Sequence, residues 1–254
     1  MLLAIGIGNT NIAFGLYGQG EWFHHWRIRT VRDKMPDEYA VLLRSLMRDE
    51  GLAMADIRRV VVSSVVPPLT GVFAELLERE MGRLPLIVGR GARTGIRIRT
   101  ENPTEVGADL VANAVAAYER FGDNCIVVDF GTALTFTAVA APGDLMGVAI
   151  APGLNIAVRA LFGNTAQLPL IQLQVPPQAI GRNTTHSIQS GIVFGYIGLV
   201  EALIRRMRAE LGGSAHAIAT GGLAQIVAPL TSEFEAINPW LTLDGLRLIA
   251  ERNT

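Results

Sequence analysis

The chain has little of several features that mark other classes of protein. Only one of its 254 residues is cysteine, so no disulfide can form within the chain and we expect a reducing compartment. Charged residues make up 18% of the sequence and apolar residues 50%, a balance that excludes a disordered protein. The formal net charge is −1 and there is no long basic run, which argues against a nucleic-acid partner.

Membrane signals are also missing from the sequence. No signal-peptide pattern follows Met1, and no uninterrupted apolar stretch reaches the roughly 18 residues that span a bilayer. We therefore expect a soluble, cytoplasmic protein with no membrane partner. The single cysteine, Cys125, lies in the apolar run 125–128, where we expect a small buried side chain.

One pattern of strands and glycine turns occurs twice along the chain. Strands are predicted at residues 2–7, 12–17 and 22–29, and the pattern restarts at 126–128, 135–140 and 146–150. Such a duplication indicates one supersecondary unit used twice, so we predict two lobes, residues 1–122 and 123–254. Helical spacing predicts helices at 37–49, 73–81, about 103–121 and 187–211, with a buried parallel strand at 59–66 and strands at 85–88, 95–99 and 217–220.

The two glycine turns are candidate phosphate sites. Aligning the copies places Gly8-Asn9-Thr10 over Gly131-Thr132-Ala133. A glycine lets backbone N–H groups approach phosphate oxygens without a Cβ in the way, and a neighbouring Thr or Asn adds a short donor. The copies facing each other would grip one nucleotide, although an ordinary hairpin turn is the alternative. In the same alignment Asp129 has Gly6 as its counterpart, so the first copy lacks the carboxylate that Mg²⁺ prefers.

A third glycine element follows the strand predicted at 217–220. Gly221-Gly222 would turn the chain at the carboxyl end of that strand, where nucleotides commonly lie in α/β proteins. The alternative is a tight connection between a strand and a helix.

Taken in order, these motifs make nearly the whole chain resemble the type III pantothenate kinases. That family belongs to the superfamily of acetate and sugar kinases, heat-shock chaperones and actin. The matching segments are Gly8-Asn9-Thr10-Asn11, Asn102-Pro103, Gly107-Ala108-Asp109, Asp129-Phe130-Gly131-Thr132-Ala133, Ala151-Pro152-Gly153-Leu154, Leu168-Pro169, Gly181-Arg182-Asn183-Thr184, Thr220-Gly221-Gly222 and Leu241-Thr242-Leu243-Asp244-Gly245-Leu246.

The resemblance implies an α/β fold of two ribonuclease H-like (actin-like ATPase) lobes, each a mixed β-sheet flanked by helices. It implies ATP-dependent phosphorylation of pantothenate to 4'-phosphopantothenate, the first step of coenzyme A biosynthesis. It also implies a homodimer that uses ATP, Mg²⁺ and a monovalent cation, K⁺ or NH₄⁺.

The resemblance also assigns roles to residues. Asp109 matches the proton acceptor, a role that suits a carboxylate held near a hydroxyl; the alternative is a first-turn Asp favoured by the helix dipole. Asp129 matches the monovalent-cation site. Thr184 matches a pantothenate contact near the dimer interface, with a helix N-cap as the alternative. The ATP-binding residues implied are Gly6, Ile7, Gly8, Asn9, Thr10, Asn11, Ile12, Ala13 and Thr132. The substrate-binding residues implied are Thr100, Gly107, Ala108, Asp109, Leu110 and Thr184.

The chain departs from the family at several of these positions. The family has Asp at position 6, Arg at 110 and an aromatic residue at 100, where this chain has Gly6, Leu110 and Thr100. Leu134 and Thr137 stand where Thr and Asp are usual. Lost polar contacts in a catalytic site often cost orders of magnitude in rate. Two alternatives therefore stay open: an impaired homologue that binds nucleotide or pantothenate in a regulatory or partner role, and a kinase for a related hydroxyl substrate.

Overall fold

The computed structural model describes residues 1–89 and 91–253, which form two compact units. Unit 1 contains Met1–Ile96, Asn102–Ala116 and Leu241–Thr254, and unit 2 contains Arg97–Glu101 and Ala117–Trp240. The contacts thus group the C-terminal segment with unit 1, whereas the lobe boundary expected after residue 122 would put it in the second lobe. That boundary stays a prediction.

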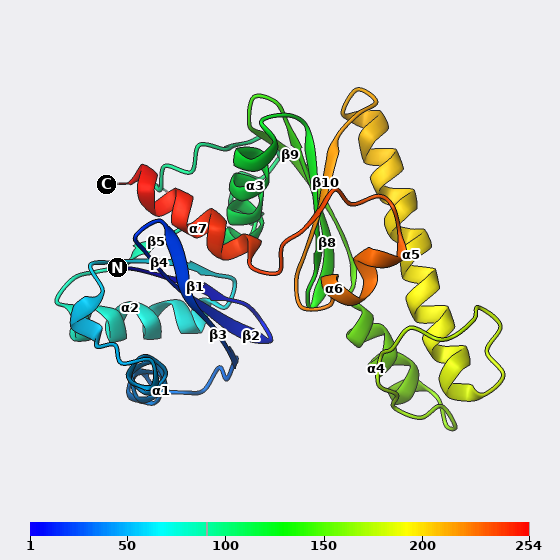
Figure 1. Ribbon diagram of the computed structural model, residues 1–254, viewed down its shortest axis with the longest axis horizontal. Coiled ribbons are helices and arrows are strands. Elements are labelled where there is room, and N and C mark those ends of the chain that lie inside the picture. Colours follow the sequence, from blue (N-terminus) through cyan, green and yellow to red (C-terminus); the bar gives the residue numbers. More distant parts are fainter. Residues whose placement is uncertain (90, 254) are drawn as a thin grey trace. The chain divides into compact units, whose positions relative to one another are not determined.

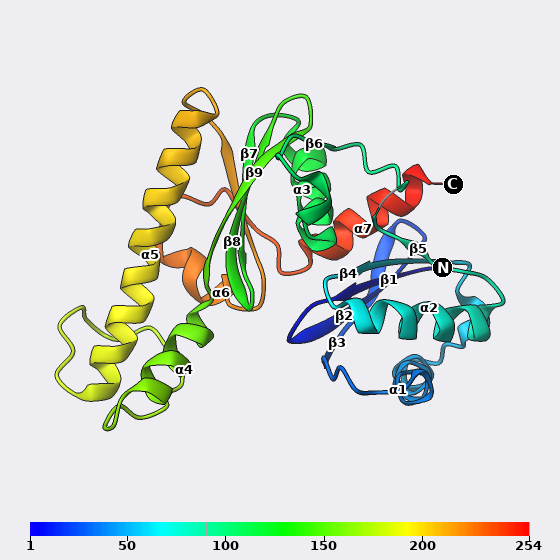
Figure 2. The ribbon, with the colours of Figure 1, turned by 180° about the vertical axis from the view of Figure 1, so that it is seen from behind.

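Unit 1 is built on a mixed sheet whose described strands run in the order β3-β2-β1-β4-β5. Its strands are β1 (Leu2–Ile7), β2 (Asn11–Gly18), β3 (Glu21–Arg29), β4 (Arg59–Ser64) and β5 (Leu86–Ile87). The first strand pairs antiparallel with β2 and parallel with β4. Helices α1 (Pro36–Asp49) and α2 (Pro67–Met81) lie on one side of this sheet, and α7 (Leu241–Arg252) packs against β1, β4 and β2 (Figures 1 and 2).

Alternation along β1 determines which side chains meet which helices. Leu3, Ile5 and Ile7 are buried in one core with residues of α1 and α2. The residues between them point to the opposite face, because successive strand side chains alternate. Gly6 is one of these, and the nearest atoms to its Cβ position include Thr242 of α7.

Unit 2 repeats the arrangement and adds one strand. The described strands run β11-β10-β7-β8-β9-β6, so the order β9-β8-β7-β10-β11 copies β3-β2-β1-β4-β5 of unit 1. The duplication expected from the sequence is confirmed, as is the fold class of two mixed sheets flanked by helices. The strands are β6 (Arg97–Ile98), β7 (Cys125–Phe130), β8 (Ala133–Ala140), β9 (Asp144–Pro152), β10 (His216–Thr220) and β11 (Ala236–Ile237).

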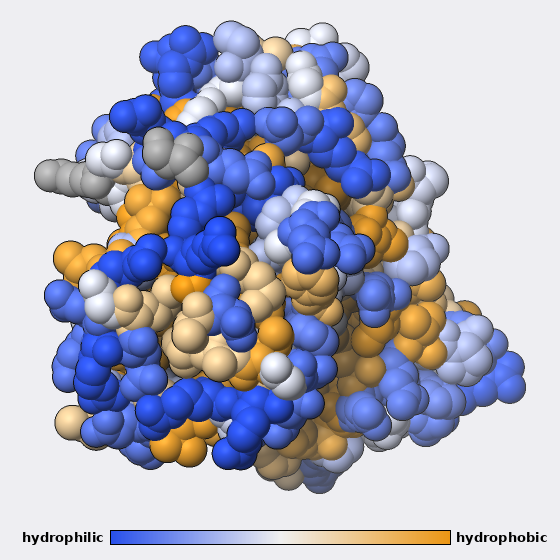
Figure 3. All heavy atoms as spheres, turned by 60° about the vertical axis from the view of Figure 1, so that its left-hand side comes forward, coloured by the Kyte–Doolittle hydropathy of each residue, from blue (hydrophilic) through white to orange (hydrophobic). Residues whose placement is uncertain are grey.

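Three helices of unit 2 share one core with its sheet. They are α4 (Leu154–Asn164), α5 (Thr184–Glu210) and α6 (Ala224–Val227). By length and composition, α5 is apolar enough to cross a membrane. Its Ile188, Val193 and Val200 are nevertheless buried against β7 and β8 residues, so the helix also has the packing of a core helix. Apolar side chains also lie at the surface between hydrophilic ones (Figure 3), as expected when half of the residues are apolar.

Two helix starts differ from the sequence expectation. The helix expected from about residue 103 is α3 (Ala108–Phe121), and Pro103–Glu105 form a separate 3-10 turn, η2. Val106 is extended between them, with ψ 120°, which interrupts the helix before Gly107. The helix expected from 187 begins at Thr184, because Asn183 rather than a threonine is its N-cap. Two more 3-10 turns are η1 (Met54–Asp56) and η3 (Ala228–Leu230).

Candidate functional site

The first glycine turn joins β1 to β2 and is held in shape from the end of β3. The Gly8 N–H donates to the Asn11 carbonyl at 3.0 Å. Thr30 braces the turn twice, because its hydroxyl donates to the Gly8 carbonyl at 2.6 Å and its N–H donates to the Thr10 carbonyl at 2.9 Å. Asn9 and Thr10, at the tip of the turn, are both exposed.

Arg32 lies beside this turn and was missed by sequence reasoning. Its Nη2 donates to Asn9 Oδ1 at 2.9 Å, and the side chain is exposed. A guanidinium next to a glycine turn adds a fixed positive charge where an anion would bind. The sequence signal was weak, because a basic residue just after a strand is common. The pairing of Asn11 with Arg29 brings the segment beside the turn.

Asp109 lies in the first turn of α3, where Gly107 makes room for it. A Cβ built on Gly107 would lie 2.5 Å from Asp109 Oδ1 and 3.3 Å from Val65 Cγ1. The Asp109 carboxylate accepts a hydrogen bond from the Leu110 N–H at 2.8 Å. Loss of hydration raises the pKa of Asp109 above its ordinary value, and backbone hydrogen bonds oppose this rise. A raised pKa makes the carboxylate a stronger proton acceptor.

The first turn and Asp109 come to the same edge of the unit 1 sheet. Val65 follows β4, and its N–H donates to the Ile7 carbonyl at 3.0 Å. The same residue contacts the Cβ position of Gly107. The first turn thus follows the carboxyl end of β1, and the start of α3 lies beside the carboxyl end of β4. The predicted residues that belong to unit 1 are Gly6, Ile7, Gly8, Asn9, Thr10, Asn11, Ile12, Ala13, Gly107, Ala108, Asp109 and Leu110.

Two glycines, Gly131 and Gly221, approach the Asp129 carboxylate closely at the second turn. A Cβ on Gly221 would overlap Asp129 Oδ1 and the Phe130 backbone, and Gly221 has φ +93°. A Cβ on Gly131 would lie 3.2 Å from Asp129 Oδ1, and one on Gly153 would overlap the Thr132 carbonyl. The close approach of three backbone segments therefore depends on glycine at these positions. The Gly221 turn expected from the sequence thus lies against the second glycine turn.

The remaining predicted residues lie elsewhere in unit 2. Thr132 is exposed beyond the end of β7, and Thr184 is the exposed first residue of α5. Thr184 is not the helix cap, because the Asn183 side chain accepts from the His186 N–H at 2.8 Å. Thr100 is half-buried, and its hydroxyl has no hydrogen-bond partner among the described residues.

Leu134, one of the positions expected to depart from the family pattern, has a packing role. Leu134 is fully buried in the unit 2 core with Phe130 and Phe136. An apolar residue there contributes to the core beside α4 and α5. Thr137 is also buried, at 1% exposure.

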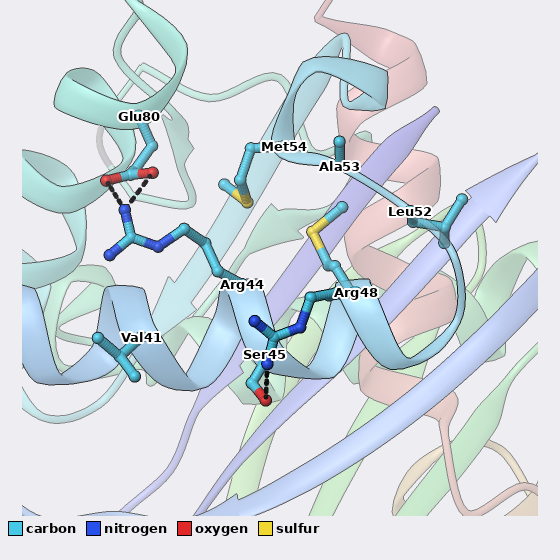
Figure 4. Close-up of a pocket in the computed structure, with 9 residues that line it drawn as sticks. Val41, Arg44, Ser45, Arg48, Leu52, Ala53, Met54 and Glu80 are labelled. Carbon is cyan, nitrogen blue, oxygen red and sulfur yellow. Dashed lines mark hydrogen bonds and ion pairs between the residues drawn. The ribbon is translucent and has the colours of Figure 1, made fainter.

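A surface hollow of about 590 Å³ lies elsewhere on unit 1 (Figure 4). It is lined by α1, the segment 52–54 and Glu80 of α2. Arg44 lies at its side and forms an ion pair with Glu80 at 3.2 Å, while Arg48 donates to Ser45. The residues expected from the sequence to form the site do not line it.

The family model and the curated relatives name the same family. The model described as "Type III pantothenate kinase" matches residues 2–206. The chain is 50% identical to the type III pantothenate kinase of Moorella thermoacetica over all of both chains. It is 51% identical to that of Thermomicrobium roseum, covering 99% of this chain and 97% of the relative. Among solved structures, the ethanolamine utilization protein EutJ of Carboxydothermus hydrogenoformans is similar in fold, with TM-score 0.58, 14% identity and coverage of 97% and 89% of the two chains.

Proposed function

The chain belongs to the type III pantothenate kinase family, and we propose that it transfers the terminal phosphoryl group of ATP to the terminal hydroxyl of pantothenate. Membership of a kinase family implies the use of ATP and a divalent metal ion, which we take to be Mg²⁺. The observation that carries the proposal is the full-length match, supported by a carboxylate of raised pKa beside a phosphate-type turn.

Asp109 has the properties of the proton acceptor in this reaction. As the pantothenate oxygen attacks the terminal phosphorus and the bond to ADP breaks, the hydroxyl proton passes to the Asp109 carboxylate. Burial supports this role because it raises the pKa of Asp109, and Gly107 supports it because it leaves space for the carboxylate. The pantothenate contacts we propose are Thr100, Gly107, Ala108, Asp109, Leu110 and Thr184.

The two glycine turns are the proposed phosphate contacts. On the first turn, Gly8 offers backbone approach while the exposed Asn9 and Thr10 offer side-chain donors and acceptors. On the second, Thr132 is the proposed ATP contact. Asp129, which Gly131 and Gly221 approach closely, is the proposed ligand of a monovalent cation, K⁺ or NH₄⁺. The proposed ATP-binding residues are Gly6, Ile7, Gly8, Asn9, Thr10, Asn11, Ile12, Ala13 and Thr132.

We also propose that the protein is a homodimer. Unit 2 exposes several large apolar side chains, and side chains of this kind are often covered at protein interfaces. They are Met146, Ile150, Ile156, Phe162, Leu170, Val175 and Ile180. Light scattering after gel filtration tests the proposal. A dimer that Ile150→Glu converts to monomer supports it, and a monomer at all concentrations contradicts it.

A cytoplasmic location without nucleic-acid or membrane partners completes the proposal. It is supported by the single cysteine and by the net charge of −1. The lobe division at residue 122 is proposed as the limit of the two copies of the duplicated unit.

A coupled assay of ATP consumption with pantothenate, Mg²⁺ and K⁺ tests the activity. Turnover by the natural protein that is lost in Asp109→Asn establishes the kinase and contradicts an impaired homologue. Absence of turnover with pantothenate contradicts the proposed function. Thr104→Ala, a change in the neighbouring η2 turn, serves as the control and should keep its activity.

A further inference from the structure

The first phosphate turn offers no carboxylate to a metal ion. Residues 1–20 contain neither Asp nor Glu, and β4 beside them contains none either. Among the described residues, no cluster of three or more His, Cys, Asp or Glu side chains could hold a metal. Protein-bound Mg²⁺ is usually held by one or two carboxylates together with phosphate oxygens and water. Asp109, at the same edge of the sheet, is assigned to the hydroxyl proton, so the first turn itself supplies no direct carboxylate ligand to Mg²⁺.

A side chain could nevertheless start at Gly6 without a clash at its Cβ atom. A Cβ on Gly6 would lie 3.8 Å from Ser63 Oγ and 3.9 Å from Thr242 Cγ2, which are ordinary van der Waals separations. The φ angle of Gly6 is not in the left-handed region. By contrast, a Cβ on Gly15 of β2 would lie 2.5 Å from the Trp22 ring. Neither packing nor backbone conformation requires glycine at position 6.

Ser63 supplies a polar group beside Gly6. We call the space bounded by Gly6, Ser63 and Thr242 the Gly6 recess. Ser63 is 1% exposed, and its hydroxyl has no hydrogen-bond partner among the described residues. Buried hydroxyl groups nearly always have a partner, so an unpaired one beside an open backbone position points to a missing group.

The second copy of the turn shows the same position occupied. Gly6 pairs with Ser63 across the parallel β1–β4 ladder, and Asp129 pairs with Thr220 across the parallel β7–β10 ladder. Thr220 is as buried as Ser63, at 1% exposure. One copy therefore has an acid in register with a buried hydroxyl, and the other has the hydroxyl without the acid.

We infer that this chain binds its nucleotide without a metal ligand on the first turn, and that the Gly6 recess is a preformed position for a carboxylate held by Ser63. The inference rests on the proposed function because it takes ATP as the ligand. It follows that the affinity for the nucleotide depends little on Mg²⁺. A carboxylate added at position 6 would repel bare phosphates and attract the metal, so both effects make binding depend on Mg²⁺.

Isothermal titration calorimetry tests this with a non-hydrolysable ATP analogue, in Mg²⁺ and in EDTA. For the natural protein we expect the two dissociation constants to agree within about threefold, and for Gly6→Asp we expect their ratio to rise about tenfold or more. Gly6→Asn has nearly the same shape as Gly6→Asp without the charge, so its ratio of dissociation constants should not rise as that of Gly6→Asp does. Circular dichroism establishes that each variant is folded.

Ser63→Ala tests the part that the recess plays. On its own, Ser63→Ala should leave the ratio of the two dissociation constants unchanged. In the Gly6→Asp background it should reduce the rise in that ratio severalfold. The inference is overturned if the natural protein loses more than tenfold in nucleotide affinity without Mg²⁺. It is also overturned if the ratio of dissociation constants for Gly6→Asp equals that of the natural protein. Product formation is measured separately, so a protein that binds as expected but does not phosphorylate pantothenate contradicts the proposed function and leaves this inference standing.

Discussion

The carboxylate of Asp109 occupies the place that a side chain on Gly107 would take. A Cβ on Gly107 would lie 2.5 Å from Asp109 Oδ1, well inside van der Waals contact. We therefore expect Gly107→Ala to displace the carboxylate and to lower kcat by about 10²-fold, since misplaced catalytic groups lose rate of this order. Steady-state kinetics measure the effect, with Gly71→Ala of α2 as control because its Cβ position is open. An unchanged kcat would contradict the placement.

The pKa of Asp109 predicts a stability change as well as a loss of activity. Burial raises this pKa above 3.8, so the folded state holds the proton more tightly than the unfolded state. Asp109 therefore contributes most to the free energy of unfolding at pH values below its pKa in the unfolded state. This contribution falls as the pH rises through its pKa in the folded state. Asp109→Asn should lower kcat by about 10²–10⁴-fold. It should also raise the free energy of unfolding at neutral pH.

Urea denaturation at several pH values measures that stability change. The gain in the free energy of unfolding of Asp109→Asn over the natural protein should be present at pH 7, should shrink as the pH falls, and should disappear below about pH 3.8. A variant that is less stable at pH 7 would contradict burial as the cause of the pKa shift.

Gly221 is expected to tolerate no side chain. Its φ of +93° is in the left-handed region, and a Cβ would overlap Asp129 and Phe130. Gly221→Ala should destabilise the protein by about 1–3 kcal/mol, the usual cost of backbone strain. If Asp129 binds the monovalent cation, the response of the rate to K⁺ should also weaken. Gly198→Ala in α5 has open space at its Cβ and should be neutral or stabilising. Equal melting temperatures of the two variants would contradict the prediction.

Arg32 is expected to contribute to nucleotide binding. Its guanidinium lies beside Asn9 on the first turn, where it would attract phosphate. Arg32→Ala should raise the KM for ATP about threefold to tenfold with a smaller effect on kcat, and this increase should shrink at high salt. Arg32→Lys should recover part of the loss, because it keeps the charge without the planar fork. Arg48→Ala, on the distant end of α1, is the control. An ATP KM equal in Arg32→Ala and Arg48→Ala would contradict the role.

Cys125 is expected to be chemically inert in the folded protein. Its side chain is fully buried, and burial, with a smaller effect of Asp123, raises the pKa of the thiol to about 12. The reactive thiolate is therefore nearly absent at neutral pH. An aromatic disulfide reagent should label no thiol in the native protein and one thiol after denaturation. Rapid labelling of the native protein would contradict the burial.

Most of the secondary structure could be read from the sequence because it depends on local patterns. The strand predicted at 2–7 is β1, since a short apolar run before a glycine turn is typical of a strand. The helix start near 103 was wrong by one turn and more, because Val106 is extended beside Gly107, a contact that local periodicity does not contain. Asn183 was overlooked as the N-cap of α5 because two threonines, which can also cap a helix, directly follow it.

The sequence by itself determined the duplicated turns, the family and the candidate residues, because these depend on residue order. The tertiary structure decided which side chains lie beside each glycine turn. Arg32 reaches Asn9 through the pairing of β2 and β3, and Ser63 faces Gly6 through the register of two strands more than fifty residues apart. Register across a sheet is fixed by the packing of the whole core, and so the Gly6 recess could not be read from the chain alone.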